Sequence, residues 1–433
     1  MQNELQDTQD NKDREGFKKQ ITNLADFICT KIADEYSINV SNLNDISKVK
    51  EIIVSKLRAD YNISPMEIEK INALAKISKD MLNALSGERV NYDEFYARSR
   101  QLVAGTCVGI GQGHIGIKDN IYDWVIIDEA ARSISSELAI AMQTAKRVLL
   151  VGDHLQLPPL YSNEHRKALA RELGINDTNL ELDAILRSDF ERAFDSNYGS
   201  QVRASLLTQY RMAEPICNMV SEIFYRGDLQ NGRHVIPDIY KYAPKCLIHP
   251  VTWLDTSCAK HSSHHIERDG SIYNDFEVNQ IISILEQIAK NITFLEAISQ
   301  LNNQEATIGI ICMYSEQKRL LRQKFSQKIW RDGFKDMVKI DTVDSYQGKE
   351  NRIIILSLTR SDARHSPGFL KTSNRINVAM SRAMDRLLIV GDLEMWKEHN
   401  QELPLGKVVK FMNKCGHESG YVFISANSNK EHK

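Results

Sequence analysis

Short, uniformly apolar runs separated by helix-length intervals dominate the chain after about residue 120. Apart from 338–343 (VKIDTV), these runs do not alternate apolar with polar residues, and this is typical of strands buried on both faces of a parallel sheet. Strands alternating with helical stretches predict an α/β fold. Two runs are assigned to a first sheet and four to a second: 124–127 and 148–151, then 308–313, 338–343, 353–358 and 387–390.

The first hundred residues carry a different pattern. Residues 1–15 are polar, and we expect them to be disordered. From 16 to 100 apolar residues recur at helical spacing, as at Ile68, Ile71, Leu74 and Ile77, and no glycine occurs between residues 17 and 86. The pattern predicts long helices, one of them beginning at Pro65.

Composition is that of an ordinary globular protein. The 433 residues are 42% hydrophobic and 26% charged, with a formal net charge of −2. Any nucleic-acid groove must therefore be a local basic surface. The sequence has no apolar run of membrane-spanning length and its start lacks an apolar signal core, so we expect a cytoplasmic protein without a membrane partner. Seven scattered cysteines without a C-x-x-C pair favour reduced, buried thiols.

Candidate chemistry follows the first two apolar runs. Asp128 and Glu129 come directly after 124–127, while Asp153 and Gln156 follow 148–151. The carboxyl ends of neighbouring parallel strands share one edge, where ligands of open α/β sheets bind. A single acid pair is most often a solvated helix start. Two such motifs at this interval favour a phosphoryl-transfer site with a metal holder, a base and a γ-phosphate sensor.

These motifs resemble those of superfamily 1 helicases. DEAA (128–131) and GDHLQLPP (152–159) resemble the Walker B and following motifs of the branch that contains the nonsense-mediated-decay (up-frameshift) helicase. Three further blocks follow in the family's order, at 207–232, 343–361 and 368–383. The resemblance implies two RecA-like parallel-sheet domains of the P-loop NTPase type, preceded by a helical insertion or stalk. It also implies an ATP- and Mg²⁺-dependent helicase or translocase acting on single-stranded RNA or DNA.

The resemblance also assigns roles to individual residues. Asp128 would hold Mg²⁺, Glu129 would activate water and Gln156 would contact the γ-phosphate, with Arg211 and Arg382 reaching it from the second domain. The remaining assignments, implied by motif position, form two sets: Tyr210, Glu350, Gly348 and Asp153 for nucleotide binding, and Thr106, Ser345, Tyr346 and Asn274 for the single strand.

One family motif is absent. The 433 residues contain no G-x-x-x-x-G-K-[ST] loop, whose backbone amides and lysine hold phosphates; the nearest mimic, at 113–118, has the wrong spacing. We therefore expect a partial first RecA-like domain with unpaired sheet edges. The expected division is 1–15, helical 16–100, partial first domain 101–205, second domain 206–412 and tail 413–433.

Three explanations of the missing loop remain open. A partner chain supplies it, the product is truncated, or the domain binds nucleic acid without catalysis. The isolated chain is then expected to be nearly inactive, and the alternative function is a catalytically silent nucleic-acid-binding or interaction protein derived from a helicase.

A metal site is a weaker candidate. Cys258, His261, His264 and His265 have spacings compatible with metal binding. Their loop-like surroundings and the lack of a second ligand cluster favour an ordinary loop.

Overall fold

The structure is a computed structural model that describes residues 11–36, 46–86, 92–112, 117, 121–176, 182, 185–301, 307–346 and 348–426. The chain forms two compact units, Met1–Ile121 and Tyr122–Lys433, which are considered separately. Most of the 113–118 segment lies outside the described residues.

The first unit is helical, as predicted. Its helices are α1 (Asn11–Tyr36), α2 (Ile46–Tyr61), α3 (Pro65–Ser86), α4 (Tyr92–Ser99) and α5 (Cys107–Ile110). At the start of α3 the Glu67 backbone N–H donates to Ser64 Oγ (3.3 Å) and the Glu67 carboxylate accepts from the Ser64 backbone N–H (2.8 Å), which forms a capping box. Residues 11–15 belong to α1, so the expected disordered start was too long; residues 1–10 lie outside the described residues.

A short parallel sheet opens the second unit. Strand β1 (Tyr122–Ile127) pairs with β2 (Ala145–Leu150), and Ile126 lies opposite Leu149. Helix α6 (Ser135–Met142) packs against both strands, and its Leu138 is buried.

One face of this sheet is bare among the described residues. Trp124, Ile126 and Leu149 share a face by alternation and register, and they are 52%, 65% and 46% exposed. The prediction that 124–127 is buried on both faces is therefore wrong. The expectation rested on the rule that helices cover both faces of a parallel sheet, and within the second unit the described residues supply a helix for one face only.

The second sheet has six strands, all parallel. Its order is β12-β5-β11-β10-β8-β9. The four predicted runs are confirmed as strands β8, β9, β10 and β11, so the expected α/β fold is confirmed. Strand β5 was not predicted, and β12 lies in the segment expected to be a plain tail. The bounds are β5 (Val251–Asp255), β8 (Ile308–Cys312), β9 (Val338–Thr342), β10 (Asn351–Ser357), β11 (Ala383–Gly391) and β12 (Tyr421–Ser425).

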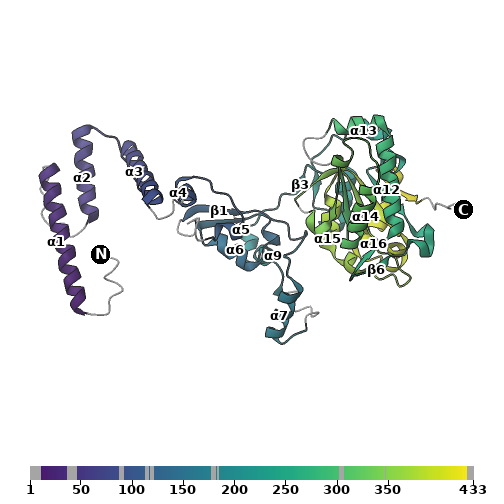
Figure 1. Cartoon of the computed structure of the whole chain (residues 1–433), viewed down its shortest axis with the longest axis horizontal. Helices are drawn as coiled ribbons and strands as arrows, with labels where there is room; N and C mark the ends of the chain where they lie inside the picture. The colour runs from purple at the N-terminus through teal and green to yellow at the C-terminus, as the bar shows by residue number, and fades with distance from the viewer. Residues whose placement is uncertain are drawn as a thin grey trace. The chain divides into compact units, whose positions relative to one another are not determined.

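Two helical layers cover this sheet (Figure 1). Alternate residues of β10 enter two separate cores: Ile354 and Leu356 pack with α11, α15 and α16, whereas Ile353 and Ile355 pack with α12, α13 and α14. These helices are α11 (Glu214–Phe224), α12 (Asp275–Lys290), α13 (Ile292–Ser299), α14 (Ser315–Gln327), α15 (Ser373–Ser381) and α16 (Pro404–Cys415). The remaining elements are α7 (Asn163–Leu173), α9 (Asp189–Asp195), α10 (Gly199–Val202), β3 (Thr208–Gln209), β4 (Gln230–Asn231), β6 (Ile266–Arg268) and β7 (Ser271–Tyr273).

Truncation of a central strand residue tests this packing. Ile355→Ala should lower the free energy of unfolding of the second unit by about 2–5 kcal/mol, because Ile355 is fully buried and its loss leaves a cavity. Ile329→Ala, at a fully exposed position, should change it by less than about 0.5 kcal/mol. Urea denaturation followed by circular dichroism measures both. Equal effects would contradict the assigned core.

Candidate functional site

The acid pair lies on a tight turn at the carboxyl end of β1. Glu129 adopts a left-handed conformation (φ 53°), which is uncommon for a residue other than glycine. The turn is fastened to β2 because the Ala130 backbone N–H donates to the Val151 carbonyl (2.9 Å). A Cβ at Gly152 would lie 2.9 Å from the Ala131 backbone nitrogen, so the close approach requires glycine. The side chains of Asp128 and Glu129 remain exposed.

Asp153 orients Gln156. One carboxylate oxygen of Asp153 accepts from the Leu155 backbone N–H (3.0 Å), and the other accepts from Gln156 Nε2 (2.8 Å) and the Tyr225 hydroxyl (2.5 Å). Burial and the Asp153 charge raise the pKa of Tyr225, which keeps this hydroxyl a donor. Asp153 is committed to these three donors. Asp153 therefore positions Gln156 in this structure, and its role in nucleotide binding stays a prediction.

Gln156 in turn meets an arginine from the second sheet domain. Arg382, at the end of α15, donates from Nη2 to Gln156 Oε1 (2.8 Å) and more weakly from Nη1 to the Lys349 carbonyl (3.4 Å). The guanidinium is buried, and its Nε has no hydrogen-bond partner among the described residues. Burial, reinforced by the charge of Arg211 and opposed by that of Glu129, lowers the pKa of Arg382 to about 10. A buried cation short of partners is suited to an anionic ligand.

Arg211 lies in the same cluster. Its guanidinium forms an ion pair with Glu350 and reaches the Ser381 carbonyl (3.4 Å). Gln209 Oε1 accepts from the backbone N–H groups of Arg211 (2.8 Å) and Met212 (2.7 Å) and so fixes this turn. The sequence had given Gln209 no role, although it stands beside the arginine motif.

Two other residues predicted to bind nucleotide, Tyr210 and Gly348, are exposed to solvent. Tyr210 is largely exposed, and Gly348 adopts φ +77°, a conformation that favours glycine. Glu350, predicted to bind the ribose, is paired with Arg211 in this structure. The cluster thus collects Gln156, Arg211, Arg382 and Glu350, with Glu129 close enough to act on the pKa of Arg382.

Helix α15 is bound along its length to the segment that carries Gln156. Asn374 Nδ2 donates to the carbonyls of His154 (3.0 Å) and Gln156 (2.5 Å), and Asn377 Nδ2 donates to the Leu155 carbonyl (3.0 Å). Sequence reasoning missed both asparagines. Their spacing of three residues, which places them on one helix face, was the available signal.

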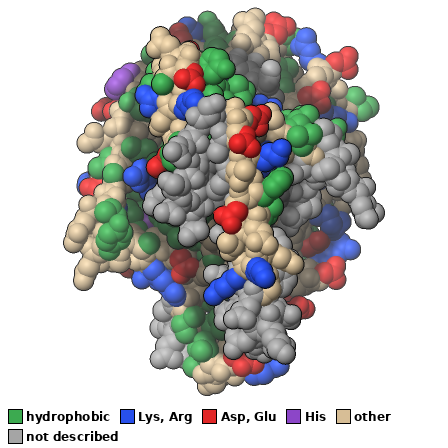
Figure 2. Space-filling model, turned by 90° about the vertical axis from the view of Figure 1, so that its left-hand side faces the viewer, with side chains coloured by type: hydrophobic (Ala, Val, Ile, Leu, Met, Phe, Trp, Pro, Cys, Tyr) green, Lys and Arg blue, Asp and Glu red, His purple; other side chains and the backbone are tan. Residues whose placement is uncertain are grey.

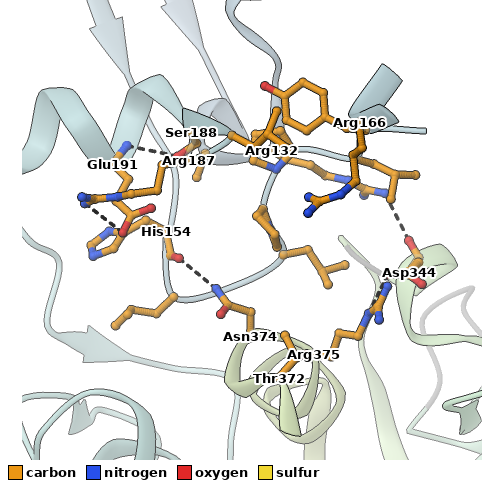
Figure 3. A pocket seen from close by; sticks show the side chains of 18 residues that line it. Arg132, His154, Arg166, Arg187, Ser188, Glu191, Asp344, Thr372, Asn374 and Arg375 are labelled. Atoms are coloured by element: carbon orange, nitrogen blue, oxygen red, sulfur yellow. Dashed lines mark hydrogen bonds and ion pairs between the residues drawn. The ribbon is translucent and has the colours of Figure 1, made fainter. Parts of the chain in front are cut away.

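A cavity of about 550 Å³ lies beside this contact (Figure 3). Arg132 donates to the Asp344 carbonyl (3.2 Å), and Arg375 forms an ion pair with the Asp344 carboxylate (3.4 Å). Four arginines and two acids line the cavity, which gives it a basic balance, together with apolar side chains from the 155–161 segment. The charged lining residues are Arg132, Arg166, Arg187, Arg375, Glu191 and Asp344.

Charge is mixed elsewhere. On the face drawn in Figure 2, Lys and Arg side chains are interspersed with Asp, Glu and apolar ones. This agrees with the net charge of −2 and with a nucleic-acid surface confined to a local groove.

Of the four residues predicted to contact the single strand, two are exposed and two are buried. Ser345 is exposed next to the cavity residue Asp344. Thr106 is exposed and caps α5 through the Gly109 backbone N–H (3.0 Å) in the first unit. Tyr346 and Asn274 are fully buried, which corrects the prediction of direct contact.

Tyr346 and Asn274 support the domain from inside. The Tyr346 hydroxyl donates to Asn351 Oδ1 (2.5 Å) within the core. Asn274 caps α12 by accepting from the Glu277 backbone N–H (3.1 Å) and donates to the Ser263 and Thr359 carbonyls. Motif position identified two structural residues that lie behind the surface.

Metal-ligating chemistry is sparse. Cys258 donates to the Ala426 carbonyl (3.1 Å), His265 Nδ1 lies 2.7 Å from the Ser361 carbonyl, and no group of three or more His, Cys, Asp or Glu in the described ranges could hold a metal ion. Mg²⁺ often takes only one or two carboxylates and completes its shell with phosphate oxygens and water, so the exposed Asp128 fits such an ion bound with a nucleotide.

No helix in the described part of the chain is long and apolar enough to cross a membrane.

Comparison with known proteins identifies the family. Two family models, each described as an AAA domain, match residues 1–164 and 185–394. The chain is 25% identical over 373 residues to helicase sen1 of Schizosaccharomyces pombe, covering 85% of this chain and 20% of that protein. It is 32% identical over 275 residues to the probable helicase MAGATAMA 3 of Arabidopsis thaliana, covering 62% and 30%. The chain belongs to the superfamily 1 helicases.

This superfamily 1 chain spans about a fifth to a third of the length of those relatives. A solved structure of arterivirus nonstructural protein 10 (helicase) with DNA matches with a TM-score of 0.30 and 14% identity, over 65% of this chain and 41% of that one. Strands β1 and β2 lie in the first matched range and most of the second sheet lies in the other, which fits the expected pair of RecA-like domains.

A buried carboxyl group, that of Glu277 in α12, contacts the end of a strand of the second sheet. Glu277 is fully buried at the carboxyl ends of β8 and β10, where its Oε2 accepts from the Ser357 hydroxyl and the Thr359 backbone N–H (both 2.8 Å). Its other oxygen has no partner among the described residues. Burial raises the pKa of Glu277 to about 8.

This shift predicts a pH-dependent stability. The folded state holds the Glu277 proton up to about pH 8, whereas the unfolded chain releases it near pH 4.5, so stability should fall as pH rises through this window. The expected slope from this group is about 1 kcal/mol per pH unit. Urea denaturation of the wild type and of Glu277→Gln from pH 5 to 9 measures the difference. Glu286→Gln serves as the control, and identical slopes in all three proteins would refute the assignment.

Proposed function

We propose that this chain is the motor part of an ATP-dependent helicase or translocase that moves along single-stranded nucleic acid. The observation that carries the proposal is the contact of Arg382 with Gln156, which joins a strand-end turn of the first sheet to the residue that follows α15. The motif order supports placement in the up-frameshift branch, whose resemblance implies movement from 5′ to 3′.

The roles of the residues follow from their chemistry. Glu129, exposed on a turn where it adopts a left-handed conformation, would activate water, and Asp128 would hold Mg²⁺. Arg382 and Arg211 would stabilise charge on the transferred phosphoryl group, as arginine fingers do. When phosphate binds, Arg382 would exchange its contact with Gln156 for the anion, so the contact would report the nucleotide state.

The missing phosphate loop sets the requirement for a completing segment. Trp124, Ile126 and Leu149 expose apolar surface on one face of a two-stranded parallel sheet whose carboxyl edge carries the acids. The Arg147 guanidinium lies 5.4 Å from the Trp124 ring centroid on this face. We assign this face to a strand–loop–helix segment with a G-x-x-x-x-G-K-[ST] loop, supplied from outside these 433 residues. Such a segment would cover the face and place its amides at the edge where Asp128 lies.

The arginine-lined cavity is assigned to the single strand. Its guanidiniums suit phosphates, and its floor of Leu157, Pro158, Pro159 and Tyr161 suits bases or sugars. Nothing in these contacts selects RNA over DNA.

A catalytically silent nucleic-acid-binding protein is the second candidate. The observation that favours it is the absence of the phosphate loop from the whole sequence. The two candidates agree on strand binding and differ on hydrolysis, which makes ATPase activity the deciding measurement.

The ATPase assay has a defined outcome. The chain alone should hydrolyse ATP negligibly. Addition of a recombinant strand–loop–helix segment from helicase sen1 should give hydrolysis stimulated by oligo(dT) or oligo(rU). Glu129→Gln should reduce that rate by at least about 100-fold, because general-base catalysis contributes about 10²–10⁴-fold. Ile126→Asp should also abolish it, by blocking docking, while Ile329→Asp should not. Brisk hydrolysis by the chain alone would overturn the requirement for the segment, and no hydrolysis with it would favour the silent candidate.

The salt dependence of single-strand binding tests the assignment of the arginine-lined cavity. Affinity for oligo(dT) should fall as salt rises, and Arg132→Gln should reduce the slope of log K against log salt by about 0.7, the value for one lost contact to a single strand. Arg268→Gln, at an exposed position outside the cavity lining, is the control and should leave the slope unchanged. Fluorescence anisotropy from 50 to 300 mM salt gives both slopes. An unchanged slope in Arg132→Gln would place the strand elsewhere.

A further inference from the structure

An exposed aromatic ring lies next to the arginine-lined cavity. Phe369 is 56% exposed, although its neighbours Leu370 and Tyr314 are buried. It belongs to a short 3-10 turn, Gly368–Lys371, that leads into α15. The ring is therefore not part of the core, and its exposure costs the protein the burial of an apolar side chain.

The ring is held in place by two partners. The centroid of the Tyr314 ring lies 5.7 Å from that of Phe369, at an interplanar angle of 34°. The guanidinium carbon of Arg375 lies 5.1 Å from the Phe369 centroid. Arg375 also lines the cavity and pairs with Asp344 (Figure 3), so the ring and the cavity share one cationic side chain.

A second arginine, Arg360, contacts residues next to the Gly368–Lys371 turn. Arg360 donates from Nε to the Tyr314 hydroxyl (3.1 Å) and from Nη1 to the Ser366 carbonyl (3.2 Å). Gly368 has φ +51°, and a Cβ there would lie 2.6 Å from Arg360 Nε. Glycine is thus needed for the turn to close over Arg360.

The backbone before Arg360 is strained. Thr359 has φ +69°, which is a genuine outlier for a β-branched residue. Glu277 accepts from its N–H (2.8 Å) and Asn274 donates to its carbonyl (3.2 Å), so two buried polar side chains hold the strained conformation. Strain maintained in this way is found where the position of a side chain matters for function. Here it fixes Arg360, and through Arg360 the Tyr314 and Phe369 rings.

We propose that Phe369 is a stacking platform for an unpaired nucleobase of the strand bound in the cavity, with Arg375 beside it for the adjoining phosphate. The inference rests on the proposed function and adds a base contact to a site otherwise assigned to the nucleic-acid backbone. A flat apolar ring beside the Arg375 guanidinium suits the π-face of any base and the charge of its phosphate. The contact would therefore be tolerant of sequence.

The test compares the full chain with Phe369→Ala and Phe369→Trp. Binding of fluorescein-labelled (dT)12 is measured by anisotropy, beside an abasic strand of the same length and charge. Phe369→Ala should weaken (dT)12 binding about 5- to 100-fold, the usual effect of losing one stacked base, while Phe369→Trp should retain it. Binding of the abasic strand should be the same in the wild type and in Phe369→Ala, because it offers no base to stack.

Tyr242→Ala is the matched control. Tyr242 is 52% exposed and also carries a cation, Lys241, 5.2 Å from its ring centroid, but Lys241 does not line the cavity, whereas Arg375 beside Phe369 does. Its loss should change binding less than twofold.

The outcomes separate this inference from the proposed function. Equal losses for (dT)12 and the abasic strand, or no loss in Phe369→Ala while Arg132→Gln weakens binding, would overturn the stacking role alone. Failure of the wild type to bind any single strand would overturn the proposed function itself.

Discussion

The binding of α15 to the segment 154–156 is the interaction on which the candidate site depends. Three backbone carbonyls of this segment accept hydrogen bonds from Asn374 and Asn377, and the side chain of Gln156 accepts from Arg382. Buried carbonyls left without donors would be costly, so the helix and the segment hold each other in register. The segment after the first sheet and a helix that covers the second sheet therefore both contribute side chains to the cluster of Gln156, Arg211, Arg382 and Glu350.

One short helix therefore carries residues of two sites. Asn374 and Arg375, in its first turn, line the cavity, whereas Arg382 directly follows its last residue and lies in the nucleotide cluster. Nine helical residues span about 13 Å. Under the proposed function, a displacement of Arg382 by phosphate would act on a rigid element that also shapes the cavity, and this would couple hydrolysis to strand binding.

The half-covered first sheet is the second constraint. Ile126 and Leu149 expose apolar surface that a folded sheet ordinarily buries. The acid turn above this sheet is nevertheless well formed, because Gly152 and the bond from Ala130 to Val151 fix it locally. The geometry of the acid turn is thus set by short-range contacts within the second unit.

The sequence by itself indicated most strands of the second sheet and the residues of the candidate site. Uniform apolar runs specify β8, β10 and β11 because strands covered on both sides need apolar residues at every position, whereas the edge strand β9 alternates apolar with polar residues. The ordered motifs indicated Gln156, Arg211 and Arg382. The strand β12 escaped detection because an edge strand of five residues in a polar tail has a weak pattern. The roles of Asn374, Asn377 and Gln209 were also missed, since an amide's partner depends on contacts between distant segments.

Only the tertiary structure decided which motif residues reach the surface. Tyr346 and Asn274 stand beside exposed residues in sequence, yet both are buried, because the turn after β9 and the start of α12 face the core. Phe369 shows the reverse: an apolar residue in an apolar context that remains exposed, because Leu370 occupies the core position next to it. Burial is a property of the packed sheet and its helices, and no local pattern of a few residues fixes it.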